Sequence, residues 1–309
     1  MLTILLTGLG VALVAALAWL YTPDRPRAAL EAAYAGPPSQ FLEIAGVRLH
    51  VRDTGPRDAP AVILLHGFGS SLHTWDAWAV DLERDHRVVR YDLPGFGLTG
   101  PDPSGDYTDA RSIAILIALM DRLGLARTSL VGHSMGGRIA WTAAAMHPER
   151  IDRLVLVSPD GFASPDIGYG ATPHVPPLMR ALPYVLPSAM LRGSLAAAYA
   201  DKSVLTEKLF TRYRDMMLAP GVRQAIVQRM GQQVLVDPVP LLRTIQAPTL
   251  LLWGQQDGMI PFSNAADYQR ALPHATLSPL PGVGHIPQEE APATVALVRA
   301  FIDGVSAGP

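Results

Sequence analysis

The sequence predicts an α/β protein with a mostly parallel eight-stranded sheet, helices on both faces and an inserted helical cap. Three observations lead to this prediction. Short apolar runs alternate with helical segments, as is typical of βα units in a parallel sheet. The alternation stops between Val157 and Thr249, where a helical pattern replaces it. Polar residues follow several of the apolar runs, and active residues collect at the carboxyl ends of parallel strands.

Composition limits the classes of function. The chain has 309 residues, 49% of them hydrophobic, which suffices for one large α/β domain with an insertion or for two ordinary domains. The net charge is −2 and no basic tract occurs, so nucleic acid is not expected as a partner. The absence of cysteine excludes disulfides, thiolate metal sites and cysteine nucleophiles.

Residues 1–21 contain no charged side chain and are long enough to cross a bilayer as a helix, which needs about 20 apolar residues. A signal peptide usually has a Lys or Arg before its apolar run and a shorter run, and this segment has neither feature. We therefore expect an uncleaved membrane anchor, in a bacterial inner membrane. The alternative is a cleaved signal peptide, because Ala16-Leu17-Ala18 offers a cleavage pattern, and the protein would then be secreted or periplasmic. Arg25 and Arg27 favour a cytoplasmic catalytic domain, but the side stays open.

The rest of the chain divides by composition and pattern. Residues 22–40 form a connector rich in Pro and Ala, with a short helical patch at 27–34. We expect the α/β core to comprise residues 41–161 and 238–309, and the helical cap to comprise residues 162–237.

The expected strands of the core differ in their hydrophobic pattern. The first two alternate around Gly46 as a β-hairpin, and the third is continuously apolar, as in a strand buried on both faces. In chain order the strands are residues 41–44, 47–51, 61–65, 86–91, 128–131, 154–157, 250–253 and 275–280. Expected core helices are residues 72–82, 113–123, 139–146, 263–271 and 294–301.

The cap region has its own helical signal, with apolar residues at helical spacing from Leu205 to Met217, before Pro220-Gly221. It also holds five of the ten methionines: Met179, Met190, Met216, Met217 and Met230. These side chains can pack the cap on the core, form a pliable apolar roof over a hydrophobic substrate, or do both.

Gly132-His133-Ser134-Met135-Gly136 lies between an expected strand and an expected helix, which predicts a nucleophile elbow. A serine that points out of such a tight turn has a strained backbone, and Gly132 and Gly136 remove collisions on either side. The helix directs its first N–H groups to the place where an oxyanion would develop.

Four motifs in this order resemble the α/β-hydrolase fold in its capped form: His66-Gly67, Gly132–Gly136, Gly254–Asp257 and Gly282–His285. The resemblance covers residues 41 to 304. With its apolar N-terminal segment the chain is also similar to membrane-bound monoacylglycerol lipases. The core alone resembles the carbon–carbon bond hydrolases of aromatic ring degradation.

The resemblance implies a catalytic triad. Ser134 would be the nucleophile and needs a base, for which His285 in the Gly-rich loop after the last strand is the candidate. Asp257, after the penultimate strand, matches the family's usual acid, and the order Ser, Asp, His is that of the hydrolases. Asp160 is the alternative acid, because some members of the fold place it after the sixth strand.

The oxyanion hole is expected from the backbone N–H groups of Phe68 and Met135. We expect His66 to orient the Phe68 loop, and His133 to point away from Ser134. Asp92 is expected to be a turn residue bonded to its own backbone, and His50 to have a surface role.

No cofactor or metal is expected. His-x-x-x-His does not occur and the carboxylates do not cluster with histidines at ligand spacing. Gly95-Phe96-Gly97 lacks the third glycine of a nucleotide-binding loop and does not open a helix.

These features predict a serine hydrolase that cleaves carboxylic esters of lipophilic acyl groups through an acyl-enzyme. Its substrate would be a small-molecule or lipid ester, and its N-terminal helix would contact the membrane. One alternative is carbon–carbon cleavage of ring-fission products, for which Arg180 and Arg192 are candidate ligands of a diacid. Another is a non-catalytic, ligand-binding member of the fold. The oligomeric state stays unknown.

Overall fold

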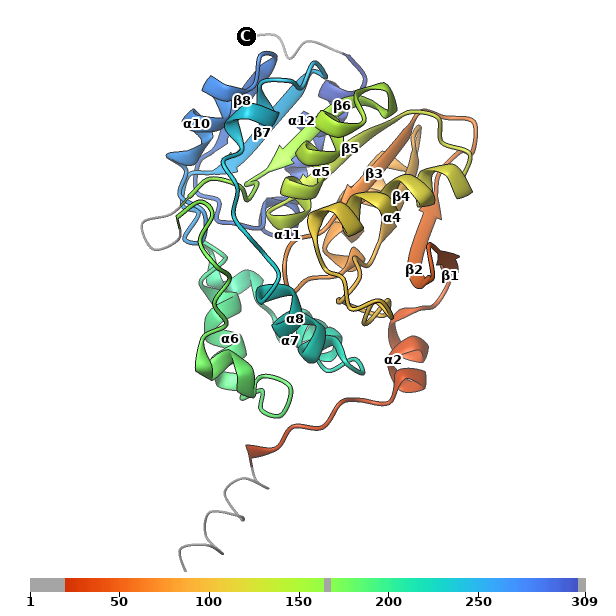
Figure 1. The fold of residues 1–309 in the computed structure, drawn as a ribbon. Helices are drawn as coiled ribbons and strands as arrows, with labels where there is room; N and C mark the ends of the chain where they lie inside the picture. Colours follow the sequence, from red (N-terminus) through yellow and green to blue (C-terminus); the bar gives the residue numbers. More distant parts are fainter. Residues whose placement is uncertain (1–19, 164–167, 305–309) are drawn as a thin grey trace, which may run out of the picture.

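The computed structural model describes residues 20–163 and 168–304, and its sheet confirms the predicted architecture (Figure 1). Eight strands are arranged in the order β1-β2-β4-β3-β5-β6-β7-β8, antiparallel where β2 pairs with β1 and β4 and parallel elsewhere. The strands are β1 Ser39–Ile44, β2 Val47–Thr54, β3 Ala61–Leu65, β4 Arg87–Tyr91, β5 Thr128–His133, β6 Ile151–Val157, β7 Thr249–Gly254 and β8 Ala275–Leu280.

Helices cover both faces of the sheet (Figure 1). The α-helices are α2 Arg27–Tyr34, α3 Asp76–Leu82, α4 Asp109–Arg122, α5 Met135–Met146, α6 Ser188–Ala196, α7 Glu207–Met217, α8 Val222–Met230, α9 Val239–Leu242, α10 Asn264–Ala271, α11 Pro287–Glu290 and α12 Val295–Ile302. The 3₁₀ helices are η1 Leu72–Trp75, η2 Pro148–Arg150, η3 Pro177–Ala181, η4 Lys202–Val204 and η5 Pro292–Thr294.

Strand β3 separates two hydrophobic clusters, because successive side chains of a strand point to opposite faces. Ile63 and Leu65 pack with the side chains of α4, α5 and α10, while Val62 and Leu64 pack with those of α3 and α12. All four are buried. The continuous apolar run therefore has the burial on both faces that its sequence predicted.

Between β6 and β7 the chain leaves the sheet and forms α6, α7 and α8, which lie together beyond one edge of it (Figure 1). The start of α7 is capped by Thr206, whose hydroxyl accepts the N–H of Leu209 at 3.3 Å. Part of the cap joins the main core through Met216, Val222 and Ile226. These contacts fix the cap over the carboxyl ends of the strands.

The connector after the apolar N-terminal segment is bound to the cap. The Thr22 N–H donates to the carbonyl of Tyr184 at 2.8 Å, and Arg223 donates to the Thr22 carbonyl at 2.6 Å and pairs with Asp24 at 2.8 Å. The predicted anchor, residues 1–21, lies almost entirely outside the described residues. In the part of the chain that the structure describes, no helix has the length and apolarity to cross a membrane.

Candidate active site

Ser134 sits in the sharp turn between β5 and α5, with φ 52° and ψ −119°. This backbone conformation is costly for a residue with a side chain and is kept by its surroundings. A Cβ on Gly132 would lie 2.4 Å from the carbonyl oxygen of Gly136, and one on Gly136 would lie 2.3 Å from that of Leu65. Both positions therefore require glycine, as the elbow motif implies.

His285 and Asp257 meet at the same edge of the sheet. The Nδ1 of His285, in the loop after β8, lies 2.8 Å from Oδ2 of Asp257, which follows β7. The other carboxylate oxygen accepts the N–H groups of Met259 and Ile260, each at 2.8 Å. Burial raises the pKa of Asp257, but these hydrogen bonds and the neighbouring imidazole outweigh it, so the pKa lies below its usual value.

The alternative acid, Asp160, has a different partner. Its Oδ2 accepts a hydrogen bond from Arg138 in α5 at 3.0 Å, and its N–H donates to the carbonyl of Ser134. The structure therefore brings Asp257, and not Asp160, onto His285. Asp160 instead links the segment after β6 to α5, the helix that follows Ser134.

The two predicted oxyanion donors are available for a ligand. Within residues 20–163 and 168–304, neither the Phe68 N–H nor the Met135 N–H donates a hydrogen bond. A Cβ on Gly67 would come within 3.1 Å of the Cβ of Ser134, so the loop after β3 lies directly against the nucleophile. Because Gly67 has no side chain, the N–H groups of Phe68 and Met135 can approach the same substrate oxygen.

His66 holds this loop in place. Its Nδ1–H donates to the carbonyl of Gly67 at 2.8 Å, and its Nε2 accepts the N–H of Leu93 at 2.9 Å. The ring is buried, and burial lowers its pKa. A neutral imidazole is the form that can donate at one nitrogen and accept at the other.

His133 has a contact that the sequence did not predict. Its Nε2–H donates to the backbone carbonyl of His285 at 2.8 Å, and the two rings are 4.7 Å apart. Burial, and then the nearby His285, lower the pKa of His133 to about 3. The residue next to the nucleophile therefore positions the loop that carries the base.

The surface role expected for His50 is wrong, and Asp92 does more than close a turn. Both side chains are fully buried, with Nδ1 of His50 2.8 Å from Asp92 Oδ2. Asp92 also accepts the N–H groups of Leu72 and Leu98 at 2.7 and 2.8 Å. This carboxylate thus connects three segments: β2, the 3₁₀ helix η1 and the turn after β4. Nothing in the local Asp-Leu-Pro-Gly pattern indicates these distant partners.

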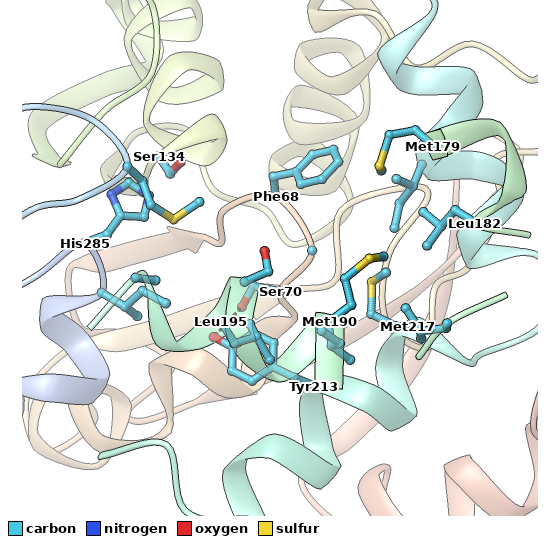
Figure 2. Close-up of a pocket in the computed structure, with 18 of the residues that line it drawn as sticks. Phe68, Ser70, Ser134, Met179, Leu182, Met190, Leu195, Tyr213, Met217 and His285 are labelled. Atoms are coloured by element: carbon cyan, nitrogen blue, oxygen red, sulfur yellow. Dashed lines mark hydrogen bonds between the residues drawn. The ribbon is translucent and has the colours of Figure 1, made fainter. Parts of the chain in front are cut away.

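A cavity of about 280 Å³ opens between the elbow and the cap. Figure 2 shows Ser134 and His285 at one end and the side chains of Met179, Leu182 and Met217 at the other. No Arg or Lys occurs among the described residues that line it. Arg180 is exposed and Arg192 pairs with Glu207 at 2.7 Å, so neither candidate for a diacid reaches the cavity.

Within residues 20–163 and 168–304, no three or more His, Asp or Glu side chains are grouped so that they could hold a metal ion.

Comparison with known proteins places this geometry in a family. A model of the alpha/beta hydrolase fold matches residues 60–292. A 2-hydroxy-6-oxononadienedioate/2-hydroxy-6-oxononatrienedioate hydrolase of Pseudomonas putida is 30% identical, over 79% of this chain and 87% of its own length.

Solved structures agree with this assignment. A membrane phospholipase A, described as a bacterial virulence factor, has a TM-score of 0.75 and 26% identity and covers 99% of this chain and 100% of its own. A meta-cleavage product hydrolase of Pseudomonas fluorescens has a TM-score of 0.74 and 25% identity and covers 86% of this chain and 98% of its own. The chain belongs to the α/β-hydrolase fold family and is a hydrolase.

Proposed function

We propose that this protein is a serine hydrolase that cleaves carboxylic esters of lipophilic acyl groups. The observation that carries the proposal is the cavity, which has Ser134 and His285 at one end and mainly apolar side chains, most of them methionine and leucine, around the rest. A pocket lined in this way favours an apolar ligand, and a few polar groups fix its orientation. An ester with a hydrocarbon acyl chain fits both requirements.

The reaction follows from the positions of the side chains. Ser134 Oγ attacks the ester carbonyl while His285 takes its proton and passes it to the leaving alcohol. Asp257 holds the imidazole through Nδ1 and stabilises the imidazolium. The N–H groups of Phe68 and Met135 donate to the oxyanion. Water, activated by His285, then attacks the acyl-enzyme and releases the carboxylic acid and free Ser134.

A second candidate is carbon–carbon cleavage of ring-fission products, which the same serine, base and oxyanion hole could perform. The names of two relatives favour it, the hydrolase of Pseudomonas putida and the meta-cleavage product hydrolase of Pseudomonas fluorescens. The cavity favours the ester, because a dianionic substrate buried among apolar side chains without a cation is strongly disfavoured.

We also propose that residues 1–21 anchor the protein in a membrane, where apolar esters concentrate. Two observations support this: the segment has no charged residue, and the membrane phospholipase A covers 99% of this chain. Carbonate extraction of membranes tests the anchor. Full-length protein should stay in the pellet, and its release into the supernatant would contradict the proposal.

The reaction is tested with p-nitrophenyl esters of C2 to C16 acids, a monoacylglycerol and a ring-fission product. We expect turnover of the esters with a preference above C4 and no turnover by Ser134→Ala. Turnover of the ring-fission product alone would replace the ester proposal by the carbon–carbon one. A fluorophosphonate should label the wild type stoichiometrically and leave Ser134→Ala unlabelled; no labelling of either would indicate a non-catalytic member of the fold.

A further inference from the structure

One cation buried in the cap has no part in the proposed reaction. Arg223, in α8, is 2% exposed and does not line the cavity. Its guanidinium donates to the carbonyls of Thr22 at 2.6 Å and Leu182 at 3.4 Å, and it pairs with Asp24 at 2.8 Å. In the described part of the chain, Asp24 is the one carboxylate that pairs with it. Because a buried charge is costly unless it is paired and hydrogen-bonded, Arg223 depends on the connector that carries Thr22 and Asp24.

The connector also bonds to a loop of the cap, residues 182–187, which joins η3 to α6. The Thr22 N–H donates to the carbonyl of Tyr184 at 2.8 Å, and the Thr22 hydroxyl oxygen accepts the N–H of Leu186 at 3.3 Å. Together with the bond to the Leu182 carbonyl, these contacts hold the loop near both of its ends. The position of the loop therefore depends on the connector.

Two further bonds join the connector to the helices on either side of the turn between α7 and α8. The Oδ2 atom of Asp24 accepts the N–H of Gly221 at 3.0 Å, directly before α8. The Arg25 N–H donates to the carbonyl of Leu218 at 2.8 Å, directly after α7. Four consecutive residues, 22–25, thus include bonds to the loop and to the ends of both helices.

The parts of the cap that the connector holds also form the apolar end of the cavity. The lining includes Leu182 and Leu186 from the loop, Met217 from α7 and Ile226 from α8. Figure 2 shows Leu182 and Met217 on the side away from Ser134. Among the described residues of the connector, none lines the cavity. The connector therefore holds the elements that a long acyl chain would contact, without contacting the chain itself.

We propose that residues 22–25 and Arg223 form a clamp, the connector clamp, that sets the preference of the cavity for long acyl chains. This rests on the proposed function and adds to it a specificity determinant that lies outside the cavity. A long chain binds more tightly to a wall that already has its bound shape, because ordering the wall on binding costs free energy. A short acyl group, held near Ser134, does not reach that wall. The clamp begins at Thr22, so it does not depend on whether residues 1–21 anchor the protein.

Asp24→Ala in the full chain tests the clamp. The Asp24 side chain is 38% exposed, so its removal breaks the pair with Arg223 and leaves no void in the core. We expect kcat/KM for p-nitrophenyl dodecanoate to fall about tenfold, through KM, and that for the butyrate to change less than about twofold. Arg223→Lys, which keeps a cation beside Asp24, should retain more of the preference than Arg223→Met.

Glu31→Ala is the matched control. Glu31 belongs to the same connector and also forms an ion pair at 2.8 Å, but its partner is Arg48 in β2, not a residue of the cap. This variant should leave kcat/KM for both esters within about twofold of the wild type. A loss of the long-chain preference in Glu31→Ala equal to that in Asp24→Ala would contradict a specific role of the bonds to the cap.

Two measurements without turnover keep the clamp separate from the proposed reaction. In Ser134→Ala, adding Asp24→Ala should raise the Kd for methyl dodecanoate about tenfold and leave that for methyl butyrate within about twofold. Hydrogen exchange of peptides that cover residues 182–187 should become faster in Asp24→Ala and not in Glu31→Ala. If the wild type cleaves neither ester, the proposed function fails, and these two measurements still decide the clamp. Equal losses for both esters, a Kd ratio unchanged by Asp24→Ala, or unchanged exchange of the loop would overturn it.

Discussion

The two walls of the cavity differ in what fixes their shape: the core wall comprises residues 68–70, 133–134 and 285–286, and the cap wall comprises the lining residues between Met179 and Ile226. On the core side the position of each reacting atom depends on backbone, and a single Cβ on Gly136 would lie 2.3 Å from the carbonyl oxygen of Leu65. On the cap side, a Cβ on Gly193 in α6 would meet nothing within 4 Å, and Met190 is 47% exposed. The core wall therefore has one workable geometry, whereas the cap wall is made of flexible side chains that can repack.

This difference separates reaction from substrate. The chemistry depends on distances that tolerate no change, so it belongs to the rigid wall. Substrate preference depends on the shape of a surface that single side chains can alter. Substitutions in the core wall should therefore reduce the rate for every ester, and substitutions in the cap wall should change which ester is preferred.

The largest effect is expected from Asp257→Asn. An amide cannot hold the His285 tautomer that accepts the Ser134 proton, so kcat for p-nitrophenyl octanoate should fall about 10⁴-fold. Asp160→Asn is the matched control, because that carboxylate pairs with Arg138 and should leave kcat within about twofold. A comparable loss in both variants would contradict the assignment of the acid.

The next largest loss of kcat is expected from Gly136→Ala. Its new methyl group must displace the carbonyls of Leu65 and His66, and with them the loop that carries the Phe68 amide. The loss of one oxyanion donor reduces kcat about 10² to 10³-fold. In the cap, Gly193→Ala should leave kcat unchanged and raise the midpoint of thermal unfolding, because alanine favours the helix and has room. Equal activity of the two variants would remove the distinction between the walls.

The difference between the two walls also explains which features the sequence predicts. The elbow, the loop after β3 and the strands that precede Asp257 and His285 have local patterns, because glycine spacing and apolar runs are fixed by backbone sterics. The family and the sheet of eight strands were predictable for this reason.

Contacts between distant segments had no such pattern. His50 and Asp92 form a buried pair 42 residues apart, although their local sequences favour a surface histidine and a turn. The hydrogen bond from His133 to the His285 carbonyl joins residues 152 positions apart. The ion pair between Arg212 and Glu289, 77 positions apart, brings α11 against α7. Such pairs depend on tertiary packing, which neither propensity nor periodicity encodes.

Acid should destabilise the α/β core, which contains the buried histidines His73 and His133. Burial lowers the pKa of His73 to about 4 and that of His133 to about 3, while an unfolded histidine titrates near about 6.5. As the pH falls below about 6.5 the unfolded chain takes up protons first. Each histidine therefore removes up to about 1.4 kcal/mol of unfolding free energy per pH unit, until its folded pKa is reached.

Urea unfolding of the whole chain at pH 7, 6 and 5 measures this slope. His73→Gln should reduce the slope by about one proton, because the ring is held in its neutral form: Nε2–H donates to the Tyr34 carbonyl at 3.1 Å, and Nδ1 accepts the Ser71 hydroxyl at 3.2 Å, which a protonated Nδ1 cannot do. His174→Gln, at an exposed position in the cap region, should leave it unchanged. The same slope in wild type and His73→Gln would show that His73 is not responsible.

The smallest change in rate, and the most selective, is expected from Met217→Trp in α7. The larger ring would fill the apolar end of the cavity, so kcat/KM should fall about tenfold for a C12 ester and less than twofold for a C4 ester. Met230→Trp in α8 is the matched control, because Met230 packs against the core without lining the cavity. Both variants carry a similar overpacking cost, which unfolding measurements can compare. If Met217→Trp slowed both esters equally, the cap wall would be setting the rate as well as the preference, and the two walls would not act separately.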